Sequence, residues 1–473
     1  MNETGMLTRQ ALLLAFQTPD ISSPEVEESL DELEELTLSA GLEVVGRLVQ
    51  SRDKMDPGSM FGAGKVGQIK SLIHQTQADT AIFDGTLSPT QGRHLENSLK
   101  VLVIDRTQLI LDIFGANART REAHLQVELA QLEYMLPRLV GMWAHLDRER
   151  GGIAGSKGMG EKQIDIDRTI IRNRISRLKK ELRHVAMERT TQKKRRTDNC
   201  FRVSLVGYTN AGKSTIMNCL TDSQTIAEDR LFATLDSTTR VMSESTRPKI
   251  LLSDTVGFIK RLPHELVASF RSTLEVAQDA DLLLHVVDLS HDCWDEHIQV
   301  TEGVLEEIGA HTVPRLLVFN KQDLVQDKVR RLLAARQYPE ALFFSAQEDD
   351  PSLLKERIVR FFEKAMITTP MKLEYADYGD LSKIYRWSRV DDVKYEQDGI
   401  HLLITSTPAN LERIRARVHV ETPPDQSGEA QSRPNEKNTA GNAAGNATGN
   451  NEDPDGDSGE EPGGKIPLAS GQS

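Results

Sequence analysis

Apolar and polar stretches alternate along the first 118 residues of the chain. Apolar runs at 42–49, 80–83 and 101–104 have the length of buried strands, and segments with helical spacing separate them. Strands that alternate with helices are typical of a parallel sheet covered by helices. We therefore predict an N-terminal α/β domain at residues 1–118.

The apolar spacing becomes purely helical between residues 119 and 199. Two apolar seams recur at steps of three and four, which are Leu125, Leu129, Leu132, Leu136 and Leu139, and then Ile171, Ile175, Leu178, Leu182 and Val185. A glycine-rich break, GGIAGSKGMG at 151–160, separates them. The pattern predicts an antiparallel helical hairpin with a glycine-rich tip, whose seams pack against each other. Pro137 should kink or interrupt the first helix.

Strand-like and helix-like segments alternate again from residue 200 to 366. Apolar strands are expected at 202–207, 249–255, 282–288, 315–320 and 341–346, which predicts a doubly wound sheet. Residues 367–420 follow as a small C-terminal α+β domain that contains a hairpin at 393–405. Residues 421–473 are polar, with Gly/Asn repeats and acids, and should form a disordered acidic tail.

The segment GYTNAGKS at 207–214 lies between a predicted strand and a predicted helix, which is the context of a P-loop. Successive backbone N–H groups and the helix N-terminus would face the phosphates of a nucleotide. Lys213 would reach the β and γ phosphates, and the Ser214 hydroxyl suits Mg²⁺. We expect nucleotide contacts from Gly207, Tyr208, Thr209, Asn210, Ala211, Gly212, Lys213 and Ser214.

A second motif, NKQD at 320–323, selects the base. The Asp323 carboxylate can accept hydrogen bonds from N1–H and the exocyclic amine of guanine, and adenine would leave that carboxylate unpaired. Asn320 can bridge the base to the P-loop, the stem of Lys321 can cover the ring, and the Ala346 N–H can point at the guanine O6. The expected base contacts are Asn320, Lys321, Gln322, Asp323, Ser345, Ala346 and Gln347.

Two further segments have the features of switches. In DTVG at 254–257, Asp254 should hold Mg²⁺ through water, and the Gly257 N–H should sense the γ-phosphate. In FATLD at 232–236, Thr234 is a candidate metal ligand, with Thr238 and Thr239 as alternatives. The expected contacts are Phe232, Ala233, Thr234, Leu235 and Asp236, then Asp254, Thr255, Val256 and Gly257. Lys213, Thr234 and Gly257 are the candidate catalytic residues.

Phe258 follows Gly257, at a position where many GTPases have a glutamine that orients the attacking water. Phenylalanine makes no such hydrogen bond, so Phe258 is either simply a hydrophobic contact of the switch or a sign that hydrolysis needs help from elsewhere, and the two interpretations are compatible. The segment HDCWDEH at 291–297 collects metal-ligand residue types without a convincing fourth ligand, and we expect it to be a solvated loop.

The formal net charge of −13 argues against a nucleic-acid binder, but its distribution is uneven. Residues 168–196 contain 12 Lys/Arg against two acids, whereas residues 421–473 contain ten acids. A basic stripe beside a glycine-rich tip favours RNA as a partner, and we expect no DNA binding. Three sparse cysteines indicate a reducing compartment, and no leader or membrane span is evident, so we expect a cytoplasmic protein.

Several segments together resemble the HflX family of ribosome-associated GTPases, a branch of the Obg-related P-loop GTPases. The resemblance covers roughly residues 10–415 and rests on VGYTNAGKST, AEDRLFATLDSTTR, SDTVGFIKRLPHELVASFRSTLEV and, upstream, VIDRTQLILDIFGANARTREAHLQVELAQLEYMLPRL and GMGEKQIDIDR. It implies Mg²⁺ at Ser214 and Thr234, which selects Thr234 among the three threonines. The chain departs from the family at Thr169, where a second arginine is usual, and in SAQEDD, which lacks the usual glycine.

The resemblance further implies a Mg²⁺-dependent GTPase that binds the large ribosomal subunit and splits or recycles stalled ribosomes. The alternative is a GTP-dependent switch that binds a non-ribosomal protein or a membrane partner. We keep peripheral membrane association open as an expectation, and we expect the free protein to be a monomer.

Overall fold

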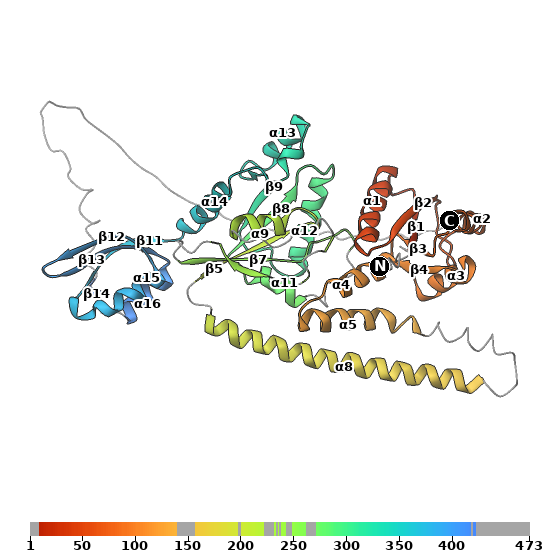
Figure 1. Cartoon of the computed structure of the whole chain (residues 1–473), viewed down its shortest axis with the longest axis horizontal. Coiled ribbons are helices and arrows are strands. Elements are labelled where there is room, and N and C mark those ends of the chain that lie inside the picture. The colour runs from red at the N-terminus through yellow and green to blue at the C-terminus, as the bar shows by residue number, and fades with distance from the viewer. Residues whose placement is uncertain are drawn as a thin grey trace, which may run out of the picture. The chain divides into compact units, whose positions relative to one another are not determined.

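A computed structural model describes residues 9–139, 157–196, 200–221, 231–232, 235, 238–242, 248–261, 271–417 and 420–421. All of them lie within one compact unit, Met1–Pro423, and the second unit, Pro424–Ser473, is outside the described residues. The predicted disordered tail also lies outside them except for Glu421, which pairs in a strand and so corrects the predicted start of the tail. Three sheets organise the described chain, and their mixture with helices confirms the predicted α/β class (Figure 1).

The first sheet has the strand order β2-β1-β3-β4, and all its strands are parallel. Its elements are β1 (Gln10–Gln17), α1 (Ser23–Ser39), β2 (Glu43–Ser51), α2 (Ala63–Thr76), β3 (Thr80–Phe83), α3 (Pro89–Leu99), β4 (Leu102–Asp105) and α4 (Arg106–Asn117). The apolar residues of β1 alternate between two cores. Leu13 packs with residues of α1 and α4, whereas Leu12 and Leu14 pack with residues of α2 and α3. Helices therefore cover both faces of this sheet.

Two helices with apolar seams follow the first sheet, α5 (Arg121–Met135) and α8 (Lys157–Arg196). Leu125, Leu129, Ile175 and Leu178 form one buried cluster, which confirms that the seams pack against each other. The two helices run side by side (Figure 1). Helix α5 ends two residues before Pro137.

One expectation about this hairpin was wrong. Helix α8 begins at Lys157, so Gly158 and Gly160 lie inside a helix rather than in the glycine-rich break; Gly151, Gly152 and Gly155 lie outside the described residues. A glycine costs a helix only about 1 kcal/mol, which a 40-residue helix tolerates.

The neighbouring helix changes the charge of the basic stripe at residues 168–196. Acids of the neighbouring helix α5 pair with its cations, since Glu128 lies 2.6 Å from Arg174 and Glu133 lies 2.7 Å from Lys179. Within α8, Arg177 pairs with Glu181 at 3.0 Å. Part of the positive charge is therefore neutralised inside the hairpin.

The second sheet has the order β10-β9-β8-β5-β7-β6, parallel except for the edge strand β6. Its elements are β5 (Cys200–Gly207), α9 (Lys213–Thr221), β6 (Thr239–Val241), β7 (Lys249–Asp254), α11 (Arg271–Gln278), β8 (Leu282–Asp288), α12 (Trp294–Glu307), β9 (Arg315–Asn320), α13 (Lys328–Gln337), β10 (Leu342–Phe343) and α14 (Pro351–Glu363). Strand β10 is shorter than predicted because hydrogen bonds to a loop carboxylate take over from the ladder after Phe344.

The third sheet is antiparallel, with the order β12-β13-β11-β14. It comprises β11 (Ile367–Leu373), α15 (Leu381–Trp387), β12 (Arg389–Glu396), β13 (Gly399–Ser406), α16 (Pro408–Arg417) and β14 (Val420–Glu421). Strands β12 and β13 form the hairpin that the sequence predicts. No helix of the described ranges has both the length and the apolarity to span a membrane.

Candidate nucleotide site

Other segments of the protein lie close to the loop between β5 and α9 at both of its glycines, Gly207 and Gly212. Gly207 has φ 147°, and a Cβ there would lie 2.1 Å from the Val286 carbonyl oxygen. Gly212 has φ 90°, and its Cβ would lie 2.2 Å from Asn320 Nδ2. Only glycine fits either position, because the conformation is strained for other residues and the space is filled. The sequence thus builds a loop whose backbone, rather than its side chains, faces the site.

Lys213 begins α9 and its ammonium group turns back along the loop. The Nζ atom donates hydrogen bonds to the carbonyl oxygens of Gly207 at 3.1 Å and Tyr208 at 2.6 Å. Burial lowers the pKa of Lys213 to about 8, and the nearby Asp254 opposes this shift in part. This ammonium group gains a strong counter-charge when a phosphate binds.

The atoms beside Lys213 fit a nucleotide with Mg²⁺. Ser214 Oγ donates to Asp254 Oδ2 at 2.6 Å, so a hydroxyl and a carboxylate converge, which are the hard oxygen donors that Mg²⁺ prefers. Thr209 Oγ1 is buried and has no hydrogen-bond partner among the described residues. A buried hydroxyl of this kind usually has a partner, and a phosphate oxygen is one.

The predicted base loops are joined to the P-loop through one side chain. Asn320, at the end of β9, donates from Nδ2 to the Ala211 carbonyl oxygen at 2.9 Å and accepts at Oδ1 from the Ala346 N–H at 3.1 Å. Asp323 is exposed in a 3₁₀ turn, Gln322–Leu324, and the Lys321 ammonium pairs with Asp288 at 2.7 Å. Three segments distant in sequence therefore meet around Asn320.

Sequence reasoning missed Asp349, which orders the SAQEDD loop. Its carboxylate accepts from the Ser345 N–H and from Gln322 Nε2, both at 2.6 Å. The loop lacks a glycine because a side chain, rather than a special backbone conformation, holds its turn. The signal was an acid four residues after the serine in a glycine-free loop.

Comparison with known proteins assigns the chain to a family. Residues 27–115 match the family model "GTP-binding GTPase N-terminal", residues 117–196 match "GTP-binding GTPase Middle Region" and residues 202–321 match "50S ribosome-binding GTPase". GTPase HflX of Magnetococcus marinus is 42% identical over 426 residues, which cover 89% of this chain and 98% of that protein. GTPase HflX of Escherichia coli is 46% identical over 301 residues, covering 63% of this chain and 70% of that protein.

The chain belongs to the HflX family of GTPases. It binds GTP and hydrolyses it to GDP and phosphate. Among solved structures, a GTP-binding protein from Sulfolobus solfataricus in complex with GDP is 24% identical, with a TM-score of 0.42, covering 75% of this chain and 98% of that chain.

In this HflX-family GTPase, the first switch is described only in part. Ala233, Thr234 and Asp236 lie outside the described residues, so the expected metal and catalytic roles of Thr234 stay predictions. Phe232 has a positive φ of 58°, and Leu235 is buried.

The two alternative threonines make contacts within the second sheet, Thr238 through its backbone and Thr239 through its hydroxyl. The Thr238 carbonyl accepts from the Asp254 N–H at 3.0 Å, and Thr239 Oγ1 hydrogen-bonds Ser253 Oγ at 2.9 Å. Both contacts belong to the edge of the second sheet.

The second switch begins against the P-loop. Thr255 Oγ1 donates to the Leu205 carbonyl at 2.6 Å, and Val256 is buried. A Cβ on Gly257 would lie 2.9 Å from Lys213 Nζ, so its backbone fills the space beside that ammonium group. The Phe258 carbonyl accepts from the Thr209 N–H at 2.7 Å, so this amide of the P-loop is bonded within the protein and not free to face a phosphate.

The segment 291–297 is not the solvated loop that the sequence suggested. Trp294 and His297 are buried, and the His297 ring stacks on Tyr208 with centroids 3.8 Å apart. Burial, with the neighbouring His291 second, lowers the pKa of His297 to about 3, so the imidazole is neutral. Tyr208, a P-loop residue, therefore has an aromatic partner that no motif predicted.

The same segment brings Glu28, His291 and Cys293 together, with ligand atoms within 4.8 Å of one another. Burial opposes ionisation of Glu28, but contacts from the Cys293 thiol and the Lys260 ammonium hold its pKa below the usual value. Because Lys260 lies 2.8 Å from this carboxylate, we assign the group to the contact between the first domain and the GTPase domain rather than to a metal.

Proposed function

We propose that this GTPase binds the large ribosomal subunit and separates stalled ribosomes into subunits. The observation that carries the proposal is the match of residues 202–321 to the "50S ribosome-binding GTPase" model in a chain of the HflX family. The coupling of GTP binding to ribosome binding would follow from ordering of the switches by the γ-phosphate.

The proposed nucleotide contacts are the residues that the sequence analysis names. Lys213 and the P-loop amides other than that of Thr209 bind the phosphates, and the Asp323 carboxylate reads the guanine. The Ala346 N–H, which was expected to point at the guanine O6, donates instead to Asn320 Oδ1 at 3.1 Å. Ser214, Thr234 and, through water, Asp254 hold Mg²⁺, which supplies positive charge to the phosphates when it is bound. Asn320 keeps the base loop and the P-loop at a fixed separation, since it bonds Ala211 and Ala346.

The proposal includes stimulation of hydrolysis by the ribosome. Phe258 is 1% exposed and bonds the P-loop through its backbone, so its side chain neither reaches nor orients a water molecule. We therefore expect slow hydrolysis in the free protein and faster hydrolysis with large subunits. Equal rates in both settings would contradict this part of the proposal.

The RNA contact is proposed for the cations of α8 that face solvent. Arg172, Lys180 and Arg183 are exposed and make no ion pair in the described part of the chain, unlike Arg174 and Lys179. Phosphates are the natural counter-charge for such groups, and each contact releases counterions. Binding to ribosomal RNA should therefore weaken steeply as salt rises.

Co-sedimentation with large subunits, in the presence of a non-hydrolysable GTP analogue, tests the proposal. The triple variant Arg172→Glu, Lys180→Glu and Arg183→Glu should weaken binding and lower the slope of log affinity against log salt by about two to three units. A matched control with the same charge change is Lys328→Glu, Arg336→Glu and Lys364→Glu on exposed positions of the GTPase domain. Equal binding by all three proteins would place the RNA contact elsewhere, and no binding by the wild type would favour a non-ribosomal partner.

A further inference from the structure

The P-loop and both switch segments share one apolar core with the first domain. Tyr208 of the P-loop, Leu231 and Phe232 of the first switch, and Val256 and Ile259 of the second belong to this core. Its other members come mainly from α1, α4, α5 and the first sheet. The apolar side chains of this core are removed from water only while the first domain and the GTPase domain stay together. The positions of the switches therefore depend on the first domain.

Polar contacts fix the first switch to the same domain. The Asn117 side chain donates to the Phe232 carbonyl at 2.9 Å, and the Leu231 N–H donates to Ser39 Oγ at 3.1 Å. The rings of Phe114 and Phe232 meet edge to face with centroids 4.7 Å apart. These contacts hold Phe232 in its positive φ, which is unusual for a residue with a Cβ.

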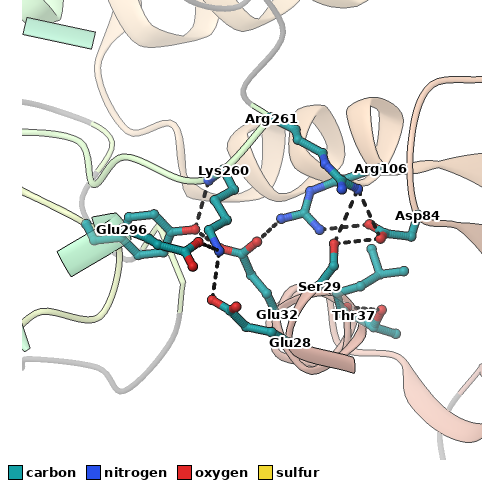
Figure 2. Close-up of polar contacts among 11 residues, drawn as sticks. Glu28, Ser29, Glu32, Thr37, Asp84, Arg106, Lys260, Arg261 and Glu296 are labelled. Carbon is teal, nitrogen blue, oxygen red and sulfur yellow. Dashed lines mark hydrogen bonds and ion pairs between the residues drawn. The ribbon is translucent and has the colours of Figure 1, made fainter. Parts of the chain in front are cut away.

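One hydroxyl joins the P-loop, the second switch and the first domain. Tyr208 Oη donates to the Glu32 carboxylate on α1 and accepts from the Lys260 N–H at 2.8 Å. Lys260 is the third residue after Gly257, and its ammonium group pairs with Glu28 and Glu296 at 2.8 and 2.6 Å. Figure 2 shows the Lys260 side chain between these two carboxylates.

Buried charges behind Glu32 hold that carboxylate in place. The Arg106 guanidinium pairs with Glu32 and with Asp84, and its side chain is 3% exposed. Asp84 also accepts from Ser29 Oγ at 2.6 Å and lies 3.4 Å from Arg261 (Figure 2). Since both oxygens of Asp84 and the Glu32 carboxylate are engaged, the network leaves Glu32 little freedom to follow Tyr208 if the tyrosine moves.

The hydrogen bonds that join Glu32, Tyr208 and Lys260 form a linkage. This linkage ends next to the proposed position of the γ-phosphate. Phe258 and Tyr208 form a parallel bridge, in which the Phe258 N–H donates to the Gly207 carbonyl at 3.1 Å. Gly257 lies directly beside Lys213 Nζ. A γ-phosphate that contacts Lys213 needs the space that Gly257 fills, so it displaces Gly257 and with it the adjoining Phe258 pairing, whereas GDP lacks this group.

From this geometry we infer that Glu32, held by Arg106, is a positioning residue that sets the preference between GTP and GDP. It acts through the Tyr208 hydroxyl, which fixes the Lys260 backbone and so keeps Gly257 and Phe258 on the P-loop. Removing the linkage lets the second switch move off the P-loop and admit the γ-phosphate at lower cost. The inference rests on the phosphate contacts proposed above for Lys213 and Gly257, and the predicted nucleotide preference does not depend on ribosome binding.

The experiment measures the affinities of the free, full-length protein for a non-hydrolysable GTP analogue and for GDP, using fluorescent nucleotides. Glu32→Ala and Tyr208→Phe should each raise the ratio of analogue to GDP affinity by about tenfold, the scale of one hydrogen bond to a charged group. Tyr208→Phe removes both hydrogen bonds of the hydroxyl, including the one to Glu32, so adding Glu32→Ala to Tyr208→Phe should leave the ratio of the double variant equal to that of Tyr208→Phe. A ratio within twofold of wild type in both single variants, or ratios that multiply in the double variant, overturns the inference.

Two controls separate this role from other effects. Tyr338→Phe removes a hydroxyl whose described partner is the neighbouring Gln337 side chain, and it should leave the ratio unchanged. A loss of folding alone would lower both affinities together and leave the ratio unchanged, which counts against the inference. Lys213→Met tests the phosphate assignment separately, since normal binding of both nucleotides by that variant refutes the proposed site and not only the linkage.

Discussion

The buried lysine of the P-loop makes nucleotide affinity depend on pH. Burial lowers the pKa of Lys213 to about 8 in the folded protein, against the usual 10.5. Phosphate binds the protonated ammonium group, so binding raises this pKa, and affinity must fall as the pH rises through the value of the free protein. For a single group with pKa 8, the affinity for GDP falls by about tenfold between pH 7 and pH 9.

Titration of GDP into the full-length protein at intervals between pH 7 and pH 9 measures this loss. The Lys213→Met variant provides the control, because its weaker residual affinity should show none of the loss that comes from Lys213. A flat profile in the wild type would mean that Lys213 keeps its proton throughout and that its burial is offset by another group. An equal loss in Lys213→Met would assign the pH dependence to a different titrating group.

Two other changes test the site and the hairpin. Asp323→Asn should weaken GTP binding by on the order of a hundredfold, because the amide cannot accept both guanine hydrogen bonds. The variant should favour xanthosine triphosphate, whose 2-oxo group accepts from the amide. Unchanged GTP selectivity over ATP in competition binding would refute the base assignment. Leu178→Ala should lower the free energy of unfolding by about 2–4 kcal/mol in a denaturant titration, since the side chain is fully buried between α5 and α8. The Met187 side chain on the same helix is 69% exposed, so Met187→Ala should change the free energy of unfolding by less than about 0.5 kcal/mol.

The sequence by itself determined those structural elements that a short run of residues specifies. The P-loop could be located because Gly207 and Gly212 must approach other backbone and side chains, and only glycine leaves that space. The seams of α5 and α8 could be paired because a helix with one apolar stripe has to bury it against another such stripe. The parallel sheets followed from strands that alternate with helices. The start of α8 could not be placed in this way, because glycines near a helix end weaken the helix without preventing it.

Only the tertiary structure decided which charges and hydroxyls meet. Glu32 and Tyr208 are 176 positions apart, and neither carries a motif that names the other. The acids that neutralise Arg174 and Lys179 belong to α5, so a count of charges along α8 alone overestimated its basicity. Asp349 orders a loop through contacts that depend on the positions of Ser345 and Gln322. A single ion pair or hydrogen bond contributes little to the free energy of folding compared with the apolar core, and it produces no periodic pattern in the sequence. Its two partners become neighbours only after burial of apolar surface has fixed the packing of the domains.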